Sequence, residues 1–125
     1  MKTGDTIQIR QHEMILPVDG EKQPIAADPP IYGANPTPID FWLYARVQEV
    51  LEDGRVRVVV AHPGNREHGA EKIVSPTETD ARGNVIHNVR TKAEVEALAS
   101  ATHHSNPQWN ARLQQHFKIQ AERLS

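Results

Sequence analysis

Histidines are the side chains in this sequence that are best suited to metal binding and proton transfer. Seven occur in 125 residues, at His12, His62, His68, His87, His103, His104 and His116. His62 and His68 share a turn-rich stretch with Glu67, which is a spacing that a metal site can use. The chain has no cysteine, however, and no His-Glu-x-x-His pattern. We therefore predict no bound metal and no cofactor.

General acid–base catalysis needs a carboxylate whose pKa is raised by burial in a cleft. Glu49 is the one carboxylate that the sequence places beside an apolar strand face. It lies close to the tip of a predicted hairpin, where small sheets open to solvent, so we expect it to be exposed. The sequence also lacks a Gly-x-Ser-x-Gly elbow, a phosphate-binding P-loop and a Gly-x-Gly-x-x-Gly motif. These observations favour a protein that is not an enzyme.

The element that must position these side chains is the stretch 41–62, which predicts two β-strands joined at Asp53-Gly54. A two-residue loop would place Leu51 opposite Val56 and create a nearly continuous apolar face. A three-residue loop with a bulge would instead place Leu51 opposite Arg55 and, further along, Glu49 opposite Arg57. We prefer the first register because it keeps the apolar side chains together.

Length and composition set the frame around this hairpin. A chain of 125 residues with 38% hydrophobic residues can form one globular domain without disulfides. A net charge of −2 argues against a general nucleic-acid binder. The longest apolar run, 41–45, is too short for a signal peptide core or a membrane span. We expect a cytoplasmic protein without membrane contact, in agreement with the absence of cysteine.

The remaining elements follow from local patterns. Residues 4–10 alternate between polar and apolar side chains and predict a first strand, and 71–74 and 85–89 predict later strands. Six of the nine prolines fall in 12–40, which predicts a long loop. A capping box at Thr91 and Glu94 opens a helix to about Ala101.

A second helix is predicted from Asn106, its N-cap, and Pro107. Its apolar side chains recur on one stripe, at Trp109, Leu113, Phe117, Ala121 and Leu124. We expect this stripe to cover Trp42, Tyr44 and Val59 of the sheet, or to pack against a second copy of the chain. The second arrangement would make the protein a homodimer or a higher homo-oligomer.

The order of these patterns resembles an SH3-like small β-barrel of the Tudor type. The resemblance rests on the Gly4-Asp5 opening, the strand at 41–50, the Asp-Gly turn, the valine-rich strand at 56–60 and the Gly64-Asn65 turn. It implies a mostly β fold with added helices: a bent antiparallel barrel of about five strands over residues 1–90, with the Pro-rich insertion at 12–40. Residues 91–125 would be a helical extension of the same domain. Tudor barrels hold methylated side chains in an aromatic cage, which would place Trp42 or Tyr44 near such a site.

A fainter similarity links the sequence to type II dihydrofolate reductases, which are SH3-like barrels that act as tetramers around one pore. The shared segment is Ala61-His62-Pro63-Gly64. The pore-lining Val-Gln-Ile-Tyr segment of that family is matched neither at 66–69 nor at 71–74. The similarity therefore implies the barrel rather than the reductase activity.

One sheet face combines aromatic and basic side chains, which can stack on bases or hold an acidic peptide. The candidate ligand-binding residues on this face and in the adjoining turn are Trp42, Tyr44, Arg46, Gln48, Arg57, His62 and Asn65. We predict a small binding or adaptor module that recognises a protein or nucleic-acid ligand through the barrel loops and this face. The alternatives are a small oligomeric enzyme with a site at a subunit interface and a structural, phage-type assembly component.

Overall fold

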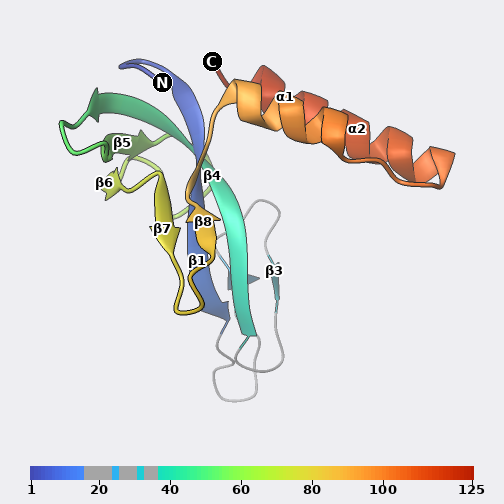
Figure 1. Cartoon of the computed structure of the whole chain (residues 1–125), viewed down its shortest axis with the longest axis horizontal. Coiled ribbons are helices and arrows are strands. Elements are labelled where there is room, and N and C mark those ends of the chain that lie inside the picture. Colours follow the sequence, from blue (N-terminus) through green and yellow to red (C-terminus); the bar gives the residue numbers. More distant parts are fainter. Residues whose placement is uncertain (16–23, 26–30, 33–36) are drawn as a thin grey trace.

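The computed structural model describes residues 1–15, 24–25, 31–32 and 37–125, and of these only the backbone course is described at 13–15, 24–25, 31–32 and 37–39. The chain is mostly β-structure followed by two helices (Figure 1). The strands are β1 (Thr6–Ile15), β2 (Pro24–Ile25), β3 (Ile31–Tyr32), β4 (Thr37–Val50), β5 (Val56–Val60), β6 (Glu71–Val74), β7 (Thr77–Thr79), β8 (Val85–His87) and β9 (Val89–Arg90). The helices are α1 (Lys92–Ala101) and α2 (Pro107–Glu122).

The central sheet is antiparallel, with the strand order β6-β5-β4-β1-β9. The pairs β2-β3 and β7-β8 form separate two-stranded sheets. In the described part of the chain, β6 and β9 lie at the two edges of the central sheet and are not paired with each other. The mostly β class with C-terminal helices is thus confirmed, and the sheet is open between its edge strands.

One face of the central sheet carries the main apolar core. Alternation along β1 and β5 points every second side chain to the same side, as period-2 strands require. The fully or almost fully buried side chains of this core are Ile7, Ile9, Leu43, Ala45, Val47, Val56, Val58, Val60 and Val89. The predicted apolar face of the 41–62 stretch is confirmed at Leu43, Ala45, Val47, Val56, Val58 and Val60, whereas Leu51 lies outside this core.

The preferred hairpin register is wrong. Glu49 pairs with Arg57 and Val50 with Val56, which is the three-residue register that we had ranked second. The backbone N–H of Leu51 donates to the carbonyl of Arg55 at 2.8 Å and closes this loop. The exposed position expected for Glu49 is confirmed.

A further shift occurs between Val47 and Glu49, beyond which Val47 pairs with Val58. The extra residue on β4 is Gln48, which makes this irregularity a β-bulge. The bulge places Val47 and Ala45 of β4 opposite the buried Val58 and Val60 of β5, although Glu49 pairs with Arg57. It explains how the apolar face stays continuous in a register that appeared to break it.

The long loop is shorter than predicted. β1 continues to Ile15 and β4 begins at Thr37, and the two strands pair along this whole length, from Thr6↔Arg46 to Ile15↔Thr37. Ladder pairing satisfies these backbone groups despite Pro38, which cannot donate a hydrogen bond. Most of the remaining Pro-rich insertion lies outside the described residues.

Both helix starts are confirmed. Thr91 accepts from the backbone N–H of Glu94, and the Glu94 carboxylate reaches back to Thr91, which is a complete capping box. Asn106 accepts from the first-turn amides of α2, with Pro107 next in the chain. The helices run side by side as a hairpin that projects from one end of the sheet (Figure 1). Among the described residues, no helix has the length and apolar content that a bilayer span requires.

Candidate functional site

The helical hairpin covers only one part of the predicted binding face, at Tyr44. Tyr44 is buried in a second apolar cluster with Val95, Phe117 and Leu124. The expected cover of the face is therefore present at Tyr44. Trp109 is 57% exposed and does not take part, because the N-terminal half of α2 lies away from the strands.

The indole ring of Trp42 is covered by a neighbouring cation, the guanidinium of Arg90. The guanidinium carbon of Arg90 lies 4.0 Å from the centre of the indole ring, which is a close cation–π contact. Burial lowers the pKa of Arg90, and the charge of Glu94 acts in the opposite direction. Both side chains are half-buried, so this end of the face is filled from within the chain.

Arg57 is also engaged. Its guanidinium forms ion pairs with Glu49 at 2.7 Å and with Glu71 at 3.4 Å, both between atoms of exposed or half-exposed groups. Arg46 and Gln48 are exposed on β4, the strand that also carries Glu49. The carbonyl of Gln48 accepts a hydrogen bond from the Thr3 hydroxyl at 3.2 Å, which holds the bulge against the N-terminal segment.

His62 and Asn65 are buried, and their hydrogen bonds stabilise the turn that follows β5. The imidazole of His62 stacks on the Tyr44 ring with centroids 5.3 Å apart, and its Nδ1 accepts from the backbone N–H of Tyr44 at 3.1 Å. The backbone N–H of His62 in turn donates to Nδ1 of His68 at 3.1 Å. The Asn65 amide oxygen accepts from the backbone N–H of Glu67 at 2.9 Å, as in an Asx turn.

These elements surround a surface cavity of about 400 Å³. Its lining residues come from β1, β4, the turn after β5 and the end of the chain, and they are Thr6, Tyr44, Ala61, His62, Pro63 and Arg123. The guanidinium carbon of Arg123 lies 5.1 Å from the centre of the Tyr44 ring. Two of the predicted site residues, Tyr44 and His62, are thus brought together here.

Sequence reasoning missed Arg123 and Thr6. Arg123 follows α2, and only the docking of Phe117 and Leu124 on Tyr44 carries it to the cavity. Thr6 reaches the cavity because it pairs with Arg46 across β1 and β4. The backbone of Thr6 is also bonded to Ser125, with the Thr6 N–H donating to the Ser125 hydroxyl at 2.6 Å. The apolar stripe of a helix and the alternation of a strand, each considered alone, do not indicate that Arg123 and Thr6 lie at the same cavity.

One group of charged side chains lies at the other end of β1 and β4. Asp40 accepts from His12 at 2.8 Å and from Arg10 at 2.9 Å, and these two partners, His12 first, lower the pKa of Asp40. Within the described ranges, no three His, Asp or Glu side chains lie close enough together to hold a metal ion. The cavity beside Tyr44 and His62 is the described cavity that contains residues of the predicted binding site.

Comparisons with known proteins give no relative for this chain: no protein-family model, no curated protein and no solved structure matches it.

Proposed function

We propose that the protein is a small binding module that holds an acidic segment of a partner protein in the cavity formed by Tyr44, His62 and Arg123. The observation that carries this proposal is the position of Arg123. Its guanidinium lies over the Tyr44 ring at the wall of a cavity of about 400 Å³. No carboxylate of the described residues forms an ion pair with it.

The chemistry of the cavity suits a carboxylate on a short apolar stem. A planar guanidinium presents paired N–H donors that match a carboxylate in two parallel hydrogen bonds. Pro63 and Ala61 supply apolar surface beside it. Arg46 adds a second positive charge nearby, because it is exposed and lies opposite the cavity residue Thr6. A peptide with two acidic side chains would meet both cations.

A protein ligand is favoured over a nucleic acid by charge and by the aromatic side chains. The chain carries a net charge of −2 and a pI of about 6.4, whereas nucleic-acid modules usually concentrate basic side chains on one face. Trp42 and Tyr44 are half-buried and buried, covered by Arg90 and by the helices. Neither ring offers an open surface on which successive bases could stack.

We also propose that the central sheet is related to an SH3-like barrel, in a form that stays open between its edge strands β6 and β9. Three features support this: the order β6-β5-β4-β1-β9, the 14-residue β4 with its bulge, and the core that is enclosed on one face. Asn88, which precedes β9, donates from its backbone to Pro76 at 2.8 Å and from its side chain to Ser75 at 3.1 Å. These bonds join the segments beside the two edge strands, which is where a barrel closes.

Calorimetry with a short polyglutamate peptide tests the binding proposal. We expect saturable binding that Arg123→Ala weakens about tenfold, equivalent to the loss of about 1.4 kcal/mol of a charge-assisted contact. Arg46→Ala should weaken it less, and Arg82→Ala, an exposed arginine in the β7-β8 turn, is the matched control. Equal effects of Arg82→Ala and Arg123→Ala would refute the site. Tighter, Arg123-dependent binding of oligothymidine would instead establish a nucleic-acid ligand.

A further inference from the structure

The helical hairpin leaves most of its surface unburied. Of the side chains in α1 only Val95 is buried, and of those in α2 only Phe117. Helices in globular proteins bury an apolar stripe against a second layer, and two helices alone do not provide one. The sheet contacts the hairpin at one end only, where Tyr44 meets Phe117 (Figure 1). No other described element forms a second layer over the rest of the hairpin.

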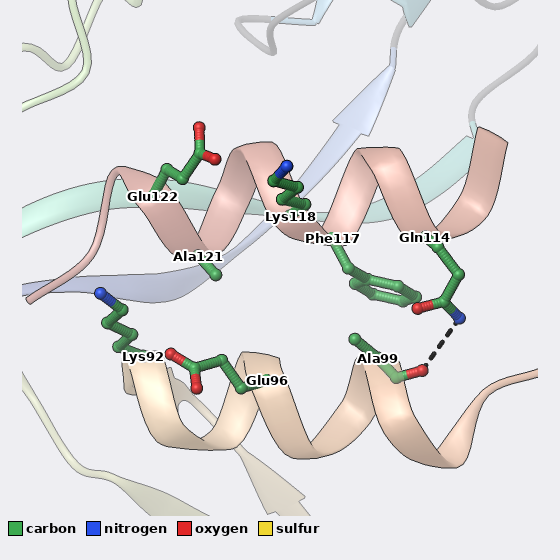
Figure 2. A pocket seen from close by; sticks show the side chains of 8 residues that line it. All are labelled: Lys92, Glu96, Ala99, Gln114, Phe117, Lys118, Ala121 and Glu122. Carbon is green, nitrogen blue, oxygen red and sulfur yellow. Dashed lines mark hydrogen bonds between the residues drawn. The ribbon is translucent and has the colours of Figure 1, made fainter. Parts of the chain in front are cut away.

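An open groove of about 450 Å³ runs between the two helices. Its floor consists of Ala99, Phe117 and Ala121, and Gln114 closes one end by donating to the carbonyls of Ala99 and Thr102 at 2.9 Å (Figure 2). The two small alanines beside a large ring make a concave apolar surface. A surface of this kind can receive side chains from another helix.

The rim of the groove carries two positive and two negative charges. Lys92 and Glu96 lie along α1, and Glu122 and Lys118 lie along α2 in the opposite order, so that Lys92 stands level with Glu122 and Glu96 stands level with Lys118 along the groove (Figure 2). Within each helix the pair runs Lys to Glu at i,i+4, which is the weaker of the two orders. None of the four forms an ion pair with another described residue, so all four can pair with a partner.

We propose that this groove is the interface of a homodimer in which two hairpins form a four-helix bundle. The two-fold axis runs along the helices. This axis places α1 of each copy beside α2 of the second copy and antiparallel to it. Lys92 then meets Glu122 of the second copy, and Glu96 meets Lys118 of the second copy. The charge pattern is its own complement under this symmetry, which selects a second copy as the occupant.

The size of the contact sets the expected strength. The 16-residue α2 is about 24 Å long, and two helices about 10 Å apart present a face on the order of 400 Å² per copy. The total of about 800 Å² is below the limit of about 1,000 Å² for a stable specific interface and is of the size of a weak, transient contact. We therefore expect a dimer that dissociates in the micromolar range. The inference is independent of the acidic-peptide site, because the groove and the cavity share no lining residue.

Sedimentation equilibrium of the full chain is the first test. We expect the mass to rise with concentration from 14.0 kDa to twice that value. Glu96→Lys alone and Lys118→Glu alone each create like-charge contacts at both symmetric positions. Each should weaken the dimer by at least about tenfold. Glu52→Lys, at an exposed position in the β4-β5 turn, is the charge-matched control and should leave the mass profile unchanged.

Mixing the two variants is the decisive test. In a mixed dimer of Glu96→Lys with Lys118→Glu, both contacts between the copies again join opposite charges. The residues at positions 96 and 118 of each single chain, in contrast, remain like-charged. We expect the mixture to recover wild-type affinity to within about threefold, measured by co-sedimentation of one fluorescently labelled variant.

Three outcomes would overturn the proposal: a monomer at every concentration, a dimer that is insensitive to Glu96→Lys, or a mixture that does not recover. Circular dichroism establishes that each variant retains its helices. If either variant fails to fold, Lys92→Glu mixed with Glu122→Lys repeats the same test at the other end of the groove. Assemblies larger than a dimer that keep forming in Glu96→Lys would place the contact elsewhere and would also overturn it.

Discussion

The ring of His62 stacks on the ring of Tyr44 at 5.3 Å between centroids, while Nδ1 of the same imidazole accepts the backbone N–H of Tyr44. The turn after β5 is thus joined to the middle of β4 by both a side-chain and a main-chain contact. Because β4 lies between β5 and β1, this pair fixes the turn relative to the whole sheet. It also sets the floor of the cavity that Arg123 adjoins.

Removing the imidazole should weaken the fold. We expect His62→Ala to lower the free energy of unfolding by about 2 to 4 kcal/mol, because a buried N–H loses its acceptor and the stacked ring is lost. His62→Asn keeps an acceptor near Nδ1 and should recover part of this loss. Urea denaturation of both variants checks the prediction. Equal destabilisation by Ala and Asn would show that the hydrogen bond contributes little.

The β4-β5 turn depends on Gly54, which has φ of +87°. We expect Gly54→Ala to lower the free energy of unfolding by about 1 kcal/mol through backbone strain, since an added Cβ meets no atom within 4 Å. Asparagine tolerates this conformation better, so Gly54→Asn should cost less. Thermal unfolding of the two variants compares them. A Gly54→Ala protein as stable as the wild type would contradict the positive φ.

Trp42 is expected to stabilise the fold rather than to bind the ligand. Trp42→Ala should lower the free energy of unfolding by about 1 to 2 kcal/mol through loss of packing and of the Arg90 contact. Polyglutamate affinity should remain unchanged. Trp42→Phe keeps an aromatic face for Arg90 and serves as the milder comparison. A fall in affinity as large as that for Arg123→Ala would show that Trp42 contributes to ligand binding.

The Asp40 carboxylate should make the free energy of unfolding depend on pH. Its pKa is lowered in the folded state by hydrogen bonding to His12 and by the charge of Arg10, so its stabilisation is present above the unfolded pKa of about 3.9. That stabilisation is lost as the pH falls through the lower folded pKa. The side chain is 54% exposed, so Asp40→Asn should cost less than about 1 kcal/mol near neutral pH.

The difference between wild type and Asp40→Asn should disappear in strong acid. Urea denaturation of the two proteins from about pH 7 to about pH 2 measures this difference directly. A gap that widens with acid would have the wrong sign for a carboxylate whose pKa is lowered.

Local sequence patterns predicted the elements well but not their pairing. The alternation before Arg10, the Asp-Gly turn and the capping box at Thr91 each depend on interactions within a few residues. The hairpin register depends instead on which side chains of the two strands share the buried face of the folded sheet. The bulge at Gln48 changes which side chains share that face, and no local signal in the sequence marks the bulge. An ion pair between Glu49 and Arg57, available only in the second-ranked register, was the one visible indication.

The candidate site was predicted in part for the same reason. Tyr44 and His62 were named from one strand and the turn beyond its partner, which the hairpin brings together. Arg57 and Trp42 share the predicted face, but their charges and rings are satisfied by neighbours that come from β6 and β9. Arg123 enters through the tertiary docking of α2. Periodicity along a single helix does not specify such a contact.

The backbone of Thr6 and that of Ser125 are hydrogen-bonded although they lie 119 positions apart in the chain. Because a contact between residues so far apart in the chain requires closure of a long loop, we expect it to form late in folding, after the strands and helices between the two residues have ordered. We therefore expect the wall of the cavity that Thr6 and Arg123 share to assemble late. Ligand binding at this cavity would report that the chain has folded along its whole length, and a kinetic intermediate that lacks the docked helices would not bind.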